Sequence, residues 1–196
     1  MEALEPKNLP SVSVLLAGAD FENPSATAAE IHGSADADLI QVFYDPVANQ
    51  LTVNRDVECI VLDTSITRVH VYAGDGDDVV QVRGGVIDYF VDGGNGNDTI
   101  TGSSGADWIQ GGSGNDWIAG ALGADYLVGA DGLDTLTGGS GGDVLVGGAD
   151  ADELFGGFGW DVIDWDATDL IVRGEDTMPG NATPPDAVLD PDEVVT

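Results

Sequence analysis

Large apolar residues recur at a fixed interval of nine positions over the second half of the chain. Eight consecutive nonapeptides run from Gly93 to Asp164, and each has Ile or Leu at its eighth position. Glycine opens every copy, aspartate fills the sixth position of all eight, and glycine fills the fourth position of all but one. The glycines favour tight turns, and the short segment after each aspartate points one large side chain inwards. The predicted inward residues are Ile100, Ile109, Ile118, Leu127, Leu136, Leu145, Leu154 and Ile163.

These nonapeptides resemble the RTX, or hemolysin-type, calcium-binding repeat G-G-x-G-x-D-x-U-x, in which U is a large apolar residue. The resemblance is tight over residues 93–164, extends with gaps to Ala73–Gln81, and extends loosely to Gly33–Gln41. It implies an all-β fold, a right-handed parallel β-roll in which six residues turn, three form a strand and two nonapeptides complete one coil.

The stacking of such coils places the position-six aspartates on two edges of the roll. Adjacent strands of a β-ladder lie about 4.8 Å apart, so an ion midway between two stacked carboxylates would lie about 2.4 Å from each. That distance suits calcium and is long for magnesium. Alternatively, each aspartate only hydrogen-bonds the backbone of its own turn. One edge would hold Asp98, Asp116, Asp134 and Asp152, and the other Asp107, Asp125, Asp143 and Asp161.

Stacked turns can supply carboxylates together with carbonyls that the glycines leave exposed. Four aspartates on each edge predict about six calcium ions between turns, and Asp78 would add a seventh. We expect unequal occupancy, because the turns GALGAD, GADGLD and GGADAD depart from the pattern, and a side chain there can block a carbonyl or the required dihedral. The predicted metal-site residues are Asp78, Gly93, Gly94, Gly96, Asp98, Gly102, Gly105, Asp107, Gly111, Gly112, Gly114, Asp116, Gly120, Gly123, Asp125, Gly129, Gly132, Asp134, Gly138, Gly139, Gly141, Asp143, Asp152, Gly156, Gly157, Gly159 and Asp161.

The repeat pattern divides the chain into four parts. Residues 1–29 form an N-terminal leader or cap, and residues 30–92 form degenerate solenoid coils with little or no calcium. Residues 93–164 form the calcium-binding β-roll. Residues 165–196 form a C-terminal cap, which comprises Trp165–Val172, followed by an acidic tail. We expect this tail to be mobile from Pro179 onwards. The degenerate coils are expected to be wider, because apolar centres about ten residues apart lie near Ile40, Leu51, Ile60, Val69, Val80, Tyr89 and Ile100.

The balance of acidic and basic residues limits the classes of function that the chain can have. With 5 Lys+Arg against 36 Asp+Glu, the net charge is -31, which excludes nucleic-acid binding. Cys59 is the single cysteine, so the chain has no internal disulfide, and it contains no apolar run long enough to span a membrane. Ser11–Ala19 looks faintly like the apolar part of a signal peptide, but Glu2 and Glu5 stand where positive charge is expected. We expect an extracellular protein, secreted or at the cell surface.

Catalytic chemistry is not predicted. The sequence has no His-Glu-x-x-His or Gly-x-Ser-x-Gly element, and His32 and His70 lack zinc-ligand spacing. Threonine pairs such as Thr135 and Thr137 resemble those of ice-binding solenoids, but residues such as Trp117 interrupt the array. A strip on the opposite face is apolar, and it would serve self-association or a protein partner, or lie under a terminal segment. The strip comprises Trp108, Tyr126, Val128, Val144, Val146 and Val162.

The sequence therefore predicts a secreted or surface calcium-binding β-roll with a structural or adhesive role and calcium-dependent folding. Two alternatives stay open. The chain could be a calcium-folded module that binds another protein through the apolar strip, or a non-catalytic fragment of a larger exported enzyme.

Overall fold

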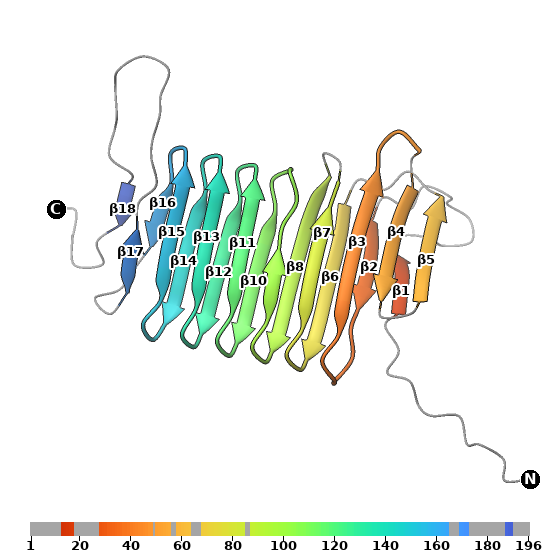
Figure 1. The fold of residues 1–196 in the computed structure, drawn as a ribbon, viewed down its shortest axis with the longest axis horizontal. Helices are drawn as coiled ribbons and strands as arrows, with labels where there is room; N and C mark the ends of the chain where they lie inside the picture. The colour runs from red at the N-terminus through yellow and green to blue at the C-terminus, as the bar shows by residue number, and fades with distance from the viewer. Residues whose placement is uncertain are drawn as a thin grey trace, which may run out of the picture.

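The computed structural model describes residues 13–17, 28–48, 50–55, 58–63, 68–84, 87–164, 169–172 and 187–189. Every regular element in these ranges is a β-strand, and they contain no helix that could cross a membrane. The strands form two nine-stranded sheets, here called sheet A and sheet B. The two sheets face each other as the two walls of the solenoid (Figure 1).

The strands of each sheet are hydrogen-bonded in the following order. Sheet A contains β1 (Ser13–Ala17), β2 (Ala28–His32), β6 (Arg68–Asp75), β8 (Asp88–Asn95), β10 (Trp108–Ser113), β12 (Tyr126–Asp131), β14 (Val144–Ala149), β16 (Val162–Asp164) and β18 (Ala187–Leu189). Sheet B contains β17 (Leu170–Val172), β15 (Glu153–Phe158), β13 (Thr135–Ser140), β11 (Trp117–Leu122), β9 (Thr99–Thr101), β7 (Val79–Arg83), β3 (Leu39–Asp45), β4 (Gln50–Arg55) and β5 (Glu58–Asp63).

From β6 to β17 the chain alternates between the two sheets, so that it winds as a solenoid of parallel strands. Equivalent residues of neighbouring coils are 18 apart within the nonapeptides, as for Asp98 and Asp116. The preceding coil is wider, with 20 residues between Asp78 and Asp98. The predicted all-β parallel solenoid is therefore confirmed, as is a wider coil before the regular repeats.

Residues 50–63 depart from the predicted coils. Strands β3, β4 and β5 pair antiparallel at one end of sheet B, with Leu51 opposite both Tyr44 and Leu62. The cause is a tight turn after β3, in which Asp45 Oδ1 accepts hydrogen bonds from the backbone N–H groups of Val47 and Ala48. A tight turn joins antiparallel neighbours, whereas a parallel coil needs a longer crossover. The expectation that Leu51 and Ile60 belong to successive coils is therefore wrong.

The core lies between the two sheets. The eight inward residues predicted from the repeat, from Ile100 to Ile163, are all fully buried. Val71, Val91 and Tyr89 continue the same core in the wider coil. Each inward side chain packs only within its own coil and against adjacent coils, so the stability of the roll depends on uninterrupted stacking.

Short strands complete both ends of the described solenoid. β1 pairs antiparallel with β2 at one end of sheet A. β17 pairs with β15 and lies within the predicted C-terminal cap Trp165–Val172, of which residues 165–168 lie outside the described residues. β18 pairs with β16. Within the predicted acidic tail, Ala187–Leu189 thus extend sheet A.

Candidate metal centre

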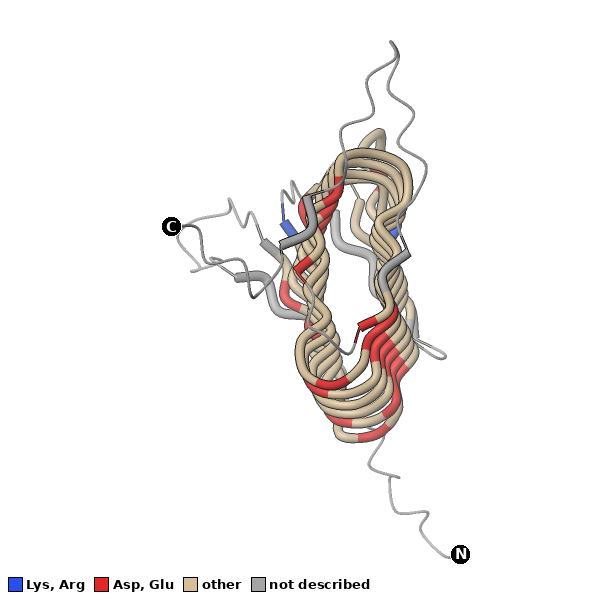
Figure 2. The backbone as a smooth tube through the Cα atoms, turned by 90° about the vertical axis from the view of Figure 1, so that its left-hand side faces the viewer, with Lys and Arg blue, Asp and Glu red and all other residues tan. Residues whose placement is uncertain are grey.

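Two columns of turns that end in a buried aspartate connect the sheets. Viewed along the solenoid axis, the coils superimpose as a flattened ring on which acidic residues recur from coil to coil (Figure 2). The first column leads from sheet A to sheet B and contains Asp38, Asp78, Asp98, Asp116, Asp134 and Asp152. The second column leads from sheet B to sheet A and contains Asp107, Asp125, Asp143 and Asp161.

In eight of the ten aspartates, one carboxylate oxygen ties its coil to the preceding one. The backbone N–H of Asp98 donates to Oδ1 of Asp116 at 2.8 Å, and the same bond recurs in both columns at 2.6–2.9 Å. The predicted stacking on two edges is thus confirmed. The bonds run between coils, which differs from the alternative of a carboxylate bonded only within its own turn.

The second carboxylate oxygen is left without a partner in most of these turns. Burying a polar oxygen without a hydrogen bond costs roughly 1–3 kcal/mol, and more when it carries charge. Several such atoms in one small fold therefore point to a missing ligand. The buried Oδ2 atoms without a hydrogen-bond partner include those of Asp78, Asp98, Asp116, Asp125, Asp134 and Asp143.

The same environment raises the pKa of these carboxyls. Burial is the main cause, and it raises the pKa of Asp116 and of Asp125 to about 7 and that of Asp78 and of Asp143 to about 6. The stacked carboxylates of adjacent coils raise it further, while hydrogen bonds from the backbone act in the opposite direction. A cation beside these oxygens would favour the ionised form and reverse the shift.

The glycine at position one makes room for the Oδ2 atom. At Gly93, the space that a side chain would fill is taken by Asp98 Oδ2 and by the carbonyl oxygen of Gly111 in the next coil. A carboxylate oxygen and a carbonyl oxygen from neighbouring coils therefore lie on the same side of this glycine. Equivalent pairs of oxygens occur beside Gly102, Gly120, Gly129 and Gly138.

Positions two and four require a backbone that glycine adopts most readily. The φ angle is positive at both positions in eight turns, for example 115° at Gly112 and 130° at Gly114. Ala121, Ala130 and Asp150 adopt it as well, with φ of 84°, 91° and 75°. The expectation that side chains at these positions block the dihedral is therefore wrong, because the backbone is kept despite the strain.

Backbone oxygens must contribute to any cation site in these columns. The described residues contain no group of three or more His, Cys, Asp or Glu side chains that could hold a metal ion. Calcium takes six to eight oxygens, from carboxylates and carbonyls alike, in an adaptable geometry. Partnerless carboxylate oxygens close to carbonyls of the next coil fit that requirement.

Two turns differ from the others, a distinction that the sequence analysis missed. In the turns that end at Asp38 and Asp107, a serine at position two donates to the aspartate through its backbone N–H and its hydroxyl. The available signal was Ser34 and Ser103 in place of glycine.

Aromatic side chains form a second feature, on the outer face of sheet A. His70, Phe90, Trp108 and Tyr126 occupy equivalent positions on β6, β8, β10 and β12, and we call them the aromatic column. Their neighbouring ring centroids are 4.9–5.9 Å apart. The predicted strip therefore continues through Phe90 to His70.

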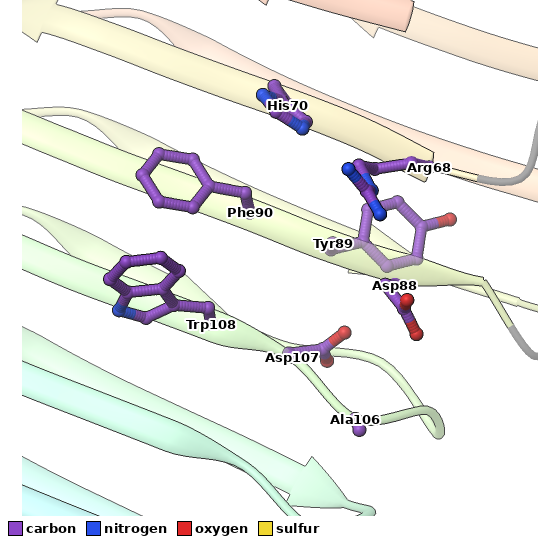
Figure 3. Close-up of a pocket in the computed structure, with 8 residues that line it drawn as sticks. All are labelled: Arg68, His70, Asp88, Tyr89, Phe90, Ala106, Asp107 and Trp108. Atoms are coloured by element: carbon purple, nitrogen blue, oxygen red, sulfur yellow. The ribbon is translucent and has the colours of Figure 1, made fainter. Parts of the chain in front are cut away.

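A hollow of about 410 Å³ opens beside the aromatic column. Figure 3 shows His70, Phe90 and Trp108 on successive strands, with Arg68 and Asp88 next to them. The hollow therefore combines aromatic rings with one cationic side chain, Arg68, and two acidic ones, Asp88 and Asp107.

Comparison with known proteins identifies the repeat. The family model of the RTX calcium-binding nonapeptide repeat, which spans four copies, matches residues 92–127 and again residues 128–163. No curated protein and no solved structure matches the chain. The matched residues coincide with the regular 18-residue coils and their aspartate columns. Residues 92–163 of this chain therefore belong to the RTX calcium-binding nonapeptide repeats, which bind calcium in a β-roll.

Proposed function

We propose that calcium ions bound along the two turn columns hold this solenoid together. The observation that carries the proposal is the set of buried Oδ2 atoms without partners. Stacked carboxylates repel by about 1 kcal/mol per pair in water, and by several times that at a protein surface. A divalent cation between coils would replace this repulsion with attraction and would satisfy the partnerless oxygens.

The proposed ligands are the position-six carboxylates together with backbone carbonyls of the glycine-rich turns. Counting one ion for each of the six Oδ2 atoms named above gives about six ions, at Asp78, Asp98, Asp116, Asp125, Asp134 and Asp143. We expect the weakest binding at Asp78, because Ala73 stands at position one of that turn, where the repeats have glycine.

Equilibrium dialysis followed by metal analysis tests this proposal. We expect about six calcium ions per chain and much weaker binding of magnesium, which demands shorter and more rigid coordination. Asp134→Asn should lower the number of bound calcium ions by about one. Asp131→Asn is the matched control, because Asp131 belongs to the same turn but is exposed, and it should leave the number unchanged. Equal numbers in both variants would contradict the assignment.

We further propose a structural or adhesive role outside the cell. An RTX β-roll is typically a structural domain, and the single cysteine leaves no internal disulfide to stabilise an exported chain. Calcium would then serve as the stabilising element. Extracellular calcium modules bind with dissociation constants of about 10⁻⁴ to 10⁻³ M. Half-saturation in that range is expected, and half-saturation at nanomolar calcium would argue for an intracellular role.

A second candidate function is suggested by the aromatic column. Trp, Tyr and Arg are enriched at the energetic centres of protein interfaces, and Trp108 is 49% exposed, with Arg68 beside the same hollow. With a net charge of -31, repulsion opposes a second copy of the chain and favours a basic partner. We propose that this face binds a protein surface that is both basic and apolar.

A labelled cationic amphipathic peptide provides a probe for this face. Its fluorescence anisotropy should show binding that is weakened at least tenfold by Trp108→Ala. Trp117→Ala is the control, because Trp117 is similarly exposed but lies on sheet B, and the charge is unchanged. Equal effects of the two substitutions would contradict the proposal, and a dimer in sedimentation velocity that Trp108→Ala dissociates would indicate a second copy instead.

A further inference from the structure

The first turn of each column is built differently from those that follow it. Turns 33–38 and 102–107 share one arrangement, although they belong to different columns and lie far apart in the sequence. The backbone N–H of Ser34 donates to Asp38 Oδ2 at 2.7 Å, and that of Ser103 to Asp107 Oδ2 at 2.6 Å. The serine hydroxyls donate to the same carboxylates, at 2.8 Å and 3.2 Å.

Each serine also shapes the turn around itself. Its hydroxyl oxygen accepts a hydrogen bond from the backbone N–H two residues later, which is Asp36 in one turn and Gly105 in the other. Such local bonds from a serine fix a turn without any ligand. Both turns are therefore held closed by the chain itself.

The backbone of these two turns also differs at the positions that matter for cation binding. The other eight turns have positive φ at positions two and four, whereas φ is positive neither at Ser103 nor at Gly105. The same holds for Ser34 and Asp36. As a result, turn 102–107 directs a backbone N–H towards its carboxylate, and an N–H group repels a cation.

We infer that Ser34 and Ser103 exclude calcium from their turns and set where each column of ions begins. In this assignment the hydroxyl and N–H donors take the place of the cation at Asp38 and Asp107. The first column of ions then begins at the coil of Asp78, and the second at the coil of Asp125. Of the seven sites expected from the sequence, the one between Asp107 and Asp125 would be absent.

This inference rests on the proposed calcium function, and a pair of matched variants separates the two. Asp107 and Asp125 are equivalent buried residues of adjacent coils in the same column. Equilibrium dialysis should show that Asp125→Asn binds about one calcium ion fewer than the unmodified chain, and that Asp107→Asn binds the same number. An equal loss in the two variants would overturn the inference.

Ser103→Gly supplies a second test, in which a site is gained. Glycine removes the hydroxyl and permits positive φ, so the turn becomes G-G-x-G-x-D like its neighbours. The number of bound calcium ions should rise by about one. Ser104→Gly is the control, because Ser104 lies next to Ser103 in the same turn but is exposed. It should leave the number of bound calcium ions unchanged.

The outcomes distinguish the two proposals. If the unmodified chain binds no calcium, the proposed function fails. If it binds calcium but Ser103→Gly gains none, only the role of the serines is wrong. Should Asp107→Asn fail to fold, Ser103→Gly alone decides, because it replaces one turn type by that of the other eight.

Discussion

The backbone N–H of Asp116 donates a hydrogen bond of 2.8 Å to Oδ1 of Asp134, 18 residues further along the chain. This bond assigns different tasks to the two carboxylate oxygens. Oδ1 joins adjacent coils and fixes the orientation of the carboxylate, whereas Oδ2 of both Asp116 and Asp134 stays buried without a partner. A single aspartate can therefore hold the stack together and offer one oriented oxygen to a cation.

Unequal effects are expected when different members of the first column are removed. Asp116→Ala removes the acceptor of the Asp98 N–H and a proposed ligand within a regular turn, so it should cost roughly 1–3 kcal/mol and lower calcium cooperativity. Asp152→Ala should be milder, because its turn has Asp150 at position four and lies near the end of the column. Calcium titration of both variants measures this ranking, and equal losses of cooperativity would contradict it.

The acidity of the buried carboxyls predicts how the calcium-free chain responds to pH. The pKa of Asp116 and of Asp125 is raised to about 7 in the fold, above the ordinary value of 3.8. A raised folded-state pKa contributes stability that is present below pH 4 and is lost as pH rises through about 7. The calcium-free chain should therefore show more β-structure at pH 4.5 than at pH 7.5 by far-UV circular dichroism. More structure at pH 7.5 would show that these carboxyls are not buried without calcium.

Protons and calcium should also compete for the same oxygens. Calcium affinity is expected to rise between pH 5 and pH 8, as the carboxyls of Asp116 and Asp125 ionise. Isothermal titration at several pH values measures this, together with the protons released. Affinity that does not change over this range would place the bound calcium away from these carboxyls.

Strained alanines offer a way to stabilise the roll. Ala130 has a φ of 91°, which L-residues rarely adopt, so Ala130→Gly should stabilise the calcium-bound chain by about 1 kcal/mol. Ala124→Gly is the control, because Ala124 is exposed and does not have positive φ, and it should be neutral or destabilising. Thermal unfolding in saturating calcium compares them. A loss of stability in Ala130→Gly would show that this position is not strained.

The C-terminal strands are expected to lower the calcium needed for folding. A chain ending at Asp164 lacks β17 and β18, which pair with β15 and β16, and it leaves Leu154 and Ile163 at an open end. It should fold only at higher calcium, because uncapped coils expose apolar side chains and unpaired strand edges. A chain ending at Pro179 keeps β17 but loses β18, and it should be intermediate. Identical calcium midpoints for both truncations and the full chain would show that the repeats need no cap.

Much of this architecture is encoded in the repeat itself. The inward residues from Ile100 to Ile163 and the two aspartate columns follow from the nine-residue period, because every copy makes the same turn and the same short strand. Two copies close one coil, so residues 18 apart must stack. The period therefore predicts the core and the site together.

Other features depend on local contacts that no period reports. Apolar spacing near ten residues suits both coils and a meander, and the hydrogen bonds that Asp45 accepts decide for the meander at β3–β4. The tail is acidic and Pro-rich, yet Ala187–Leu189 form a strand that pairs with the edge of β16. Ser103 looks like a conservative change within a glycine turn, and only the backbone shows that it closes that turn.

Far-UV circular dichroism under calcium removal tests the central claim most directly. If calcium holds the columns together, dialysis of the purified chain against a chelator at pH 7.5 should abolish most of the β-structure, because metal binding supplies much of the folding free energy. Added calcium should restore the spectrum, and an equal concentration of magnesium should not. A far-UV spectrum that chelation leaves unchanged would contradict the account.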